Sequence, residues 1–339
     1  MFWELLGEHF VHTALIAGAV VAVVSGAIGT FVVTRGLSFA VHAISELGFT
    51  GAAGALALGL DPVLGMFAGS LLVGGVLGAL SLRGNERDSS IGAVLAFGLG
   101  LGVLFLSLYQ GYATQATNLL FGSIVGVGDR QLYGLVAVAA VVTACLALIY
   151  RPLLFSSVDP DVAAARGVPL RALSVALFLL LALTTAEAIQ VVGVLLVLTL
   201  VITPAAAAQR LTVRPGLAIL LSITIALVAT EGGILLSLAQ NSISPDRPWP
   251  TSFFITTISF SVYVAARALV AAVTRATKHG AKEVAATMVP GLRVGHAHLT
   301  GQGEEKDVTG PSVDVEPPKD ARLDALENEI AARRHRERK

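Results

Sequence analysis

The sequence predicts an all-α protein whose helices cross a lipid bilayer eight or nine times. Of its 339 residues, 55% are hydrophobic and 14% are charged, and the mean hydropathy is +0.77. Such values lie outside the usual range of soluble globular proteins. Lipid admits only helices or closed barrels, because backbone polar groups must be paired internally, and the alternation typical of barrel strands is missing from the sequence. The predicted fold is therefore a polytopic bundle of transmembrane helices.

Nine apolar stretches define the predicted spans, because a bilayer core about 30 Å thick requires roughly 20 apolar residues per helix. The sixth and seventh stretches are poorly separated at Glu187, so eight spans is the alternative. Together the stretches predict a transmembrane domain over residues 1–275. In chain order they are 11–33, 37–60, 62–82, 90–110, 131–150, 170–187, 189–208, 215–239 and 252–274.

The arginines of the short loops indicate the orientation, since loops rich in Lys and Arg remain in the cytoplasm. With nine spans and an external N-terminus, the external loops hold only Arg130 and Arg247. Eight spans would break this alternation. The arginines that then lie in cytoplasmic loops are Arg35, Arg83, Arg87, Arg151, Arg166, Arg171, Arg210 and Arg214.

The composition changes abruptly after Thr274 to charged and polar residues interrupted by prolines. We expect residues 276–339 to form a cytoplasmic, largely disordered tail. Leu323, Leu326 and Ile330 would share one face of a short helix near the C-terminus.

Several classes of function are excluded by what the sequence lacks. The 23 basic and 23 acidic residues balance, so no net field attracts nucleic acid. The sequence has no nucleophile elbow, His-Glu-x-x-His helix or Cys-x-x-Cys pair, so we expect no enzyme and no permanently bound cofactor. It also has no Gly-Lys dipeptide and hence no Walker A loop. Any ATP hydrolysis must therefore occur on another chain.

Ionisable residues inside a membrane span are costly and usually mark a pathway. His42 and Glu46 are four residues apart in the second stretch, so they share one helical face. An imidazole and a carboxylate suit first-row divalent cations. We interpret the pair as part of a metal translocation path; the alternative is a structural polar link between helices.

Glu187 and Glu231 lie near the predicted outer ends of their spans. They are candidates for a gate or mouth of the pathway. The alternative is a carboxylate at the membrane interface whose side chain extends to water.

The segment SVDPDVAAARGVPLRAL lies in a loop that the charge pattern places in the cytoplasm. Asp159 is suited to an N-cap, Pro160 to the first helical position and Gly167 to a C-terminal stop. A short helix containing Asp161 and Ala163 is predicted between them.

Several segments resemble the permeases of ABC-type zinc and manganese importers, over a region that ends near Thr274. The first is RGLSFAVHAISELGFTG, in which His42 and Glu46 match the family's Asp and His with the two residue types exchanged. The second is the segment of Asp159, Ala163 and Gly167, which matches the family's ATPase coupling helix. The third is VVGVLLVLTLVITPAAAAQRL, residues 191–211.

This resemblance implies a permease subunit, in a bacterial inner or plasma membrane, that imports zinc or manganese. Its implied partners are an ABC ATPase subunit, an extracytoplasmic metal-binding protein and a second permease copy, most simply a homodimer. A self-contained secondary metal-ion transporter is the alternative, but it predicts inverted repeats, and we detect none.

Overall fold

The computed structural model describes residues 7–80, 87–109, 120–122, 124–243 and 249–288. The chain separates into two compact units, Met1–Val284 and Ala285–Lys339. Helix α12 (Thr251–Met288) continues past residue 275, where the sequence predicts the transmembrane domain to end. The remainder of the predicted tail, including its C-terminal helix, lies outside the described residues.

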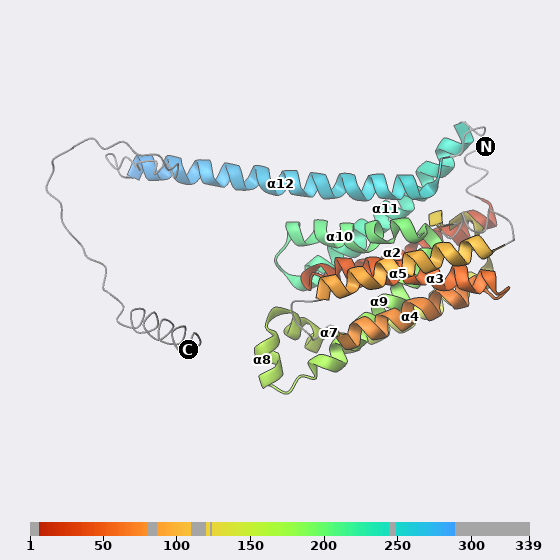
Figure 1. Ribbon diagram of the computed structural model, residues 1–339. Helices are drawn as coiled ribbons and strands as arrows, with labels where there is room; N and C mark the ends of the chain where they lie inside the picture. Colours follow the sequence, from red (N-terminus) through yellow and green to blue (C-terminus); the bar gives the residue numbers. More distant parts are fainter. Residues whose placement is uncertain (1–6, 81–86, 110–119, 123, 244–248, 289–339) are drawn as a thin grey trace, which may run out of the picture. The chain divides into compact units, whose positions relative to one another are not determined.

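Each of the nine apolar stretches coincides with a helix, and the described residues contain no strand (Figure 1). The predicted all-α class is confirmed. Besides α12 and the short helix α8 (Pro160–Ala165), the helices are α2 (His9–Thr34), α3 (Ser38–Ala57), α4 (Pro62–Leu80), α5 (Arg87–Leu108), α7 (Asp129–Val158), α9 (Leu170–Val192), α10 (Val197–Leu211) and α11 (Pro215–Ile243).

Seven of the described helices are long and apolar enough to cross a membrane, and α3 and α10 are the two predicted spans that are not. Helix α10 has only 15 residues. Helix α3 has 20, but His42, Glu46 and several small residues lower its hydropathy. Because α3 packs against α4, α5, α9 and α10, these polar side chains are held among protein helices.

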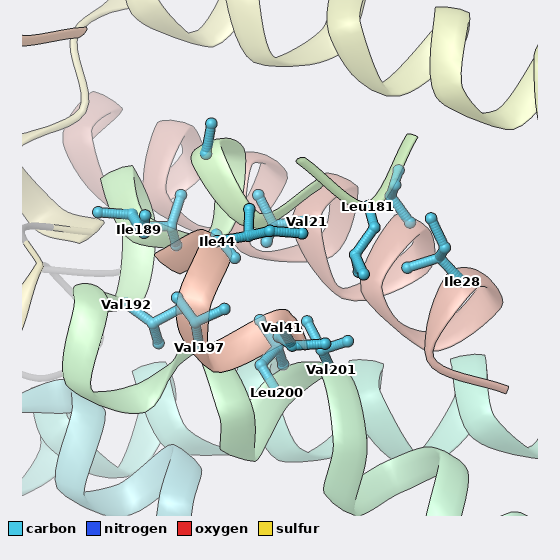
Figure 2. Close-up of a cluster of buried hydrophobic side chains, with 14 of the residues drawn as sticks. Val21, Ile28, Val41, Ile44, Leu181, Ile189, Val192, Val197, Leu200 and Val201 are labelled. Carbon is cyan, nitrogen blue, oxygen red and sulfur yellow. The ribbon is translucent and has the colours of Figure 1, made fainter. Parts of the chain in front are cut away.

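Helices α2 and α9 form the centre of the bundle. In each of them 72% of an apolar 18-residue stretch is buried. The corresponding share is 17% for α5 and α12, which are therefore peripheral. Figure 2 shows branched side chains of α2, α3, α9 and α10 meeting in one cluster. The labelled residues are Val21, Ile28, Val41, Ile44, Leu181, Ile189, Val192, Val197, Leu200 and Val201.

The boundary between the sixth and seventh spans differs from the predicted one beside Glu187. Helix α9 continues to Val192 and ends at Gly193, whose φ is +84°. This left-handed backbone is strained for residues with a Cβ atom, so glycine fixes the position of the break. A 3₁₀ turn, Val194–Leu196, then leads into α10. Glu187 therefore lies inside α9 and not at its end.

Candidate translocation site and coupling helix

His42 lies on α3 at the edge of a pocket of about 330 Å³ between α3 and α10. The α3 residues of this pocket are Ser38, Phe39 and His42. Helix α10 contributes two apolar and two hydroxyl-bearing side chains, Leu198, Ile202, Thr199 and Thr203. The imidazole is the one ionisable group among the residues that line the pocket.

The Nδ1 atom of His42 is buried and has no hydrogen-bond partner within the described residues. A buried polar atom normally finds a partner, because leaving it unpaired costs about 1–3 kcal/mol. Imidazole nitrogens are also common metal ligands. His42 therefore combines a place in the pocket lining with an imidazole nitrogen that has no partner among the described residues.

Glu46 follows one turn later on α3, and its residue is 6% exposed. The neighbouring backbone is held firmly: the Ser45 hydroxyl donates to the carbonyl oxygen of His42. The Thr50 hydroxyl lies within hydrogen-bond distance of the carbonyl oxygens of Glu46 and of Gly98 on α5. Helix α3 thus presents its imidazole and carboxylate from a fixed backbone.

The fixed position of α3 depends on close packing against α4. A Cβ atom on Gly51 would overlap the carbonyl oxygen of Gly65, and a Cβ on Gly65 would overlap that of Gly51. Small residues allow membrane helices to approach to this degree. Glycines at these two positions therefore allow α3 and α4 to pack backbone against backbone.

Glu187 is completely buried in α9, with 0% exposure. Neither carboxyl oxygen has a hydrogen-bond partner in the described part of the chain, although the group approaches the backbone of Ala139 on α7. The side chain does not extend to water, as an interfacial carboxylate would. Burying a carboxyl group without a partner costs free energy of folding. Ionisable residues inside membrane spans that carry such a cost usually have a functional role.

Glu231 is partly buried in α11, well before that helix ends. Its Oε1 atom is buried near Gly18 of α2 and has no described hydrogen-bond partner; the adjacent Thr230 hydroxyl is also unpartnered. Glu187 and Glu231 do not join His42 and Glu46 in one cluster. Among the described residues, no group of three or more His, Cys, Asp or Glu side chains is arranged to hold a metal ion.

The predicted cytoplasmic helix is present as α8. The Asp159 carboxylate accepts a hydrogen bond from the Val162 backbone at 3.0 Å, which confirms the N-cap, and Pro160 occupies the first turn. Ala163 is fully buried, whereas Asp161 is exposed. Gly167 ends the helix with φ +80°. Figure 1 shows α8 as the short helix between α7 and α9.

Sequence reasoning did not identify the polar contacts that join the helices at this end of the bundle. Arg35 donates hydrogen bonds to α7, and Gln209 on α10 donates to Thr30 and Thr34 of α2. The partners are more than 100 residues apart in sequence, so no local pattern connects them. The only available signal was Arg35 itself, a cation directly after an apolar span.

Seven of the described helices form a multi-pass membrane bundle, and the comparisons specify its class and family. The ABC 3 transport family matches residues 8–270 of the chain, which therefore belongs to this family. The resemblance inferred from the motifs is confirmed. The family also confirms that the chain is a transport subunit and not an enzyme. The predicted multi-pass location in an inner membrane is confirmed as well.

Curated relatives support this assignment. The chain is 32% identical over 246 residues to a manganese transport system membrane protein, MntC, from Listeria monocytogenes, covering 72% of this chain and 88% of the relative. It is 30% identical over 257 residues to the manganese import system permease protein ScaB of Streptococcus gordonii, covering 75% and 91%.

Solved structures share the fold. PsaBC from Streptococcus pneumoniae in complex with Fab has a chain with a TM-score of 0.68 and 29% identity, covering 78% of this chain and 94% of that one. An inward-facing putative metal-chelate type ABC transporter matches with a TM-score of 0.59 and 17% identity, covering 76% and 84%. The second comparison bears on the fold alone.

Proposed function

We propose that this permease imports a divalent metal ion, with manganese favoured over zinc, and that His42 and Glu46 contact the ion during its passage. The observation that carries the proposal is the buried, unpartnered Nδ1 of His42 at a pocket between α3 and α10. Relatives that are 30–32% identical are manganese transport proteins, and they supply the preference for manganese.

Among the donors, the oxygen atoms favour manganese, while the His42 imidazole also suits zinc. Oxygen ligands suit manganese, whereas thiolates favour zinc. The pocket beside His42 offers the hydroxyls of Thr199 and Thr203. The chain's single cysteine, Cys145, lies on α7 and not on a helix that lines this pocket.

A permease must release what it binds, so a small number of ligands is an advantage. A closed structural site with four protein ligands would trap the ion. One chain brings an imidazole and a carboxylate on α3, and a second copy in a homodimer would supply another pair. Water molecules would complete the shell of the moving ion.

The energy would come from partner chains. An ATPase subunit would bind at α8, where Asp159, Asp161 and the turn at Gly167 form the coupling segment, and an extracytoplasmic binding protein would deliver the ion. Closure of the ATPase would displace α8 and switch the bundle between its outward and inward states. Glu187 and Glu231 would act as gate or mouth residues during the switch.

The test is reconstitution of the permease in vesicles with its ATPase and binding protein. We expect ATP-dependent uptake of manganese, with zinc a weaker substrate when the two ions compete. Vesicles that lack the ATPase are the control. Metal uptake by the permease alone, driven by an ion gradient, would refute the ABC mechanism and favour the secondary transporter.

A further inference from the structure

Arg35 forms a bridge between two helices at the predicted cytoplasmic end of the bundle. It lies in the short connection between α2 and α3 and reaches the end of α7. Its Nε donates to the Ser157 hydroxyl at 2.8 Å, and its Nη2 donates to the Ser156 hydroxyl at 2.6 Å and to the Leu153 carbonyl at 3.1 Å. We refer to these contacts as the Arg35 bridge.

The surroundings make this bridge stiff. Arg35 is partly buried, and Ser156 is only 7% exposed. Hydrogen bonds from a guanidinium are shorter and stronger than neutral ones, and the flat fork fixes their direction. A cation at the C-terminal end of α7 is also stabilised by that helix's dipole. The Arg35 bridge therefore resists separation of α7 from the α2–α3 connection.

On one side, the Arg35 bridge leads directly to the coupling helix. Helix α7 ends at Val158 and α8 begins at Pro160, so Asp159 is at once the C-cap of α7 and the N-cap of α8. The two serines held by Arg35 thus lie two and three residues before this shared cap. A displacement of α8 must move the residues that Arg35 holds.

On the other side, the Arg35 bridge leads to the proposed metal site. Helix α3 begins at Ser38, and the connection before it is short and ordered: the Leu37 amide donates to the Val32 carbonyl at 2.8 Å. Ser38 and His42, one turn apart, both line the pocket between α3 and α10. A shift of Arg35 is therefore passed to the part of α3 that carries His42.

We propose that Arg35 is a positioning residue that couples movement of α8 to α3 and hence to the ion pathway. The proposal rests on the proposed function, since it assumes that an ATPase moves α8. It specifies the route by which that movement reaches the membrane interior.

A second polar link provides a matched control. The Gln209 side chain on α10 donates to the Thr30 carbonyl at 2.8 Å and to the Thr34 hydroxyl at 2.9 Å. It joins the same last turn of α2 to a neighbouring helix. These hydrogen bonds involve neither α7 nor α8. Loss of the Gln209 side chain should therefore weaken the bundle without interrupting the connection from α8 through Arg35 to α3.

The experiment measures manganese uptake per ATP hydrolysed by the complete transporter in vesicles. The variants are Arg35→Ala, the double variant Ser156→Ala with Ser157→Ala, and the control Gln209→Ala. We expect the uptake-to-ATP ratio to fall about tenfold in the first two, a typical size for coupling between sites. The control should keep the wild-type ratio. Combining Arg35→Ala with the serine changes should lower the ratio no further.

The ratio of manganese uptake to ATP hydrolysis distinguishes a loss of coupling from a loss of folded protein. A merely structural role would reduce the amount of inserted protein, so that uptake and ATP hydrolysis fall together and their ratio is kept. A wild-type ratio in Arg35→Ala would overturn the proposal, and if that variant does not insert, the same result in the serine variant would overturn it. An absence of ATP-dependent uptake in the wild type would instead refute the proposed function.

Discussion

Gly51 of α3 and Gly65 of α4 face each other so closely that a methyl group on either would overlap the carbonyl oxygen of the other. This contact fixes the helix that carries His42 and Glu46. Replacing Gly51 with alanine should destabilise the protein by about 1–3 kcal/mol, the usual cost of overpacking. The midpoint of thermal unfolding in detergent would measure the effect.

Gly100 provides the control for this change. It lies on the exposed side of α5, and a Cβ atom there meets nothing within 4 Å. Gly100→Ala should therefore leave the midpoint unchanged or raise it slightly, since alanine favours a helix over glycine. Equal midpoints for the two variants would show that the α3–α4 contact is looser than described.

The end of α8 allows a conformational test of coupling. Gly167 has φ +80° and nothing within 4 Å of an added Cβ, so only backbone strain opposes a substitution. Valine strongly disfavours this conformation, whereas asparagine tolerates it. We expect Gly167→Val to hydrolyse ATP with little metal uptake and Gly167→Asn to remain coupled. Full uptake by the valine variant, at matched protein level, would argue against a coupling role for α8.

Glu187 allows stability and function to be separated. Its carboxyl group is buried without a described hydrogen-bond partner, so Glu187→Leu should keep or raise the midpoint of thermal unfolding. If the carboxyl group serves as a gate, metal uptake by the same variant should fall. Normal uptake would remove Glu187 from the pathway, and a lowered midpoint would indicate a structural partner for the group.

The sequence predicted the helices well because apolar length is a local property. All nine stretches became helices, and the caps at Asp159 and Gly167 are those that their residue types favour. The errors occur where local signals compete. The charge of Glu187 predicts a break between two spans, but a buried carboxyl group can remain inside a helix, and Gly193 supplies the positive φ that ends α9.

The candidate site was predicted only in part. Helical spacing placed His42 and Glu46 on one face of α3, but the pocket with Thr199 and Thr203 depends on packing between distant segments. The bridge from Arg35 to Ser156 and Ser157 has the same origin, since its partners are more than 100 residues apart in sequence. Such contacts cannot be read from the spacing of residues within one span.

The most direct test of the ion pathway is manganese uptake by His42→Ala and Glu46→Gln in the complete transporter, at matched levels of inserted protein. The controls are His12→Ala and Glu8→Gln, the same changes at exposed positions. We expect both α3 variants to lose most uptake while they still insert and bind the ATPase, and both controls to transport normally. Full manganese uptake by both α3 variants would contradict the pathway.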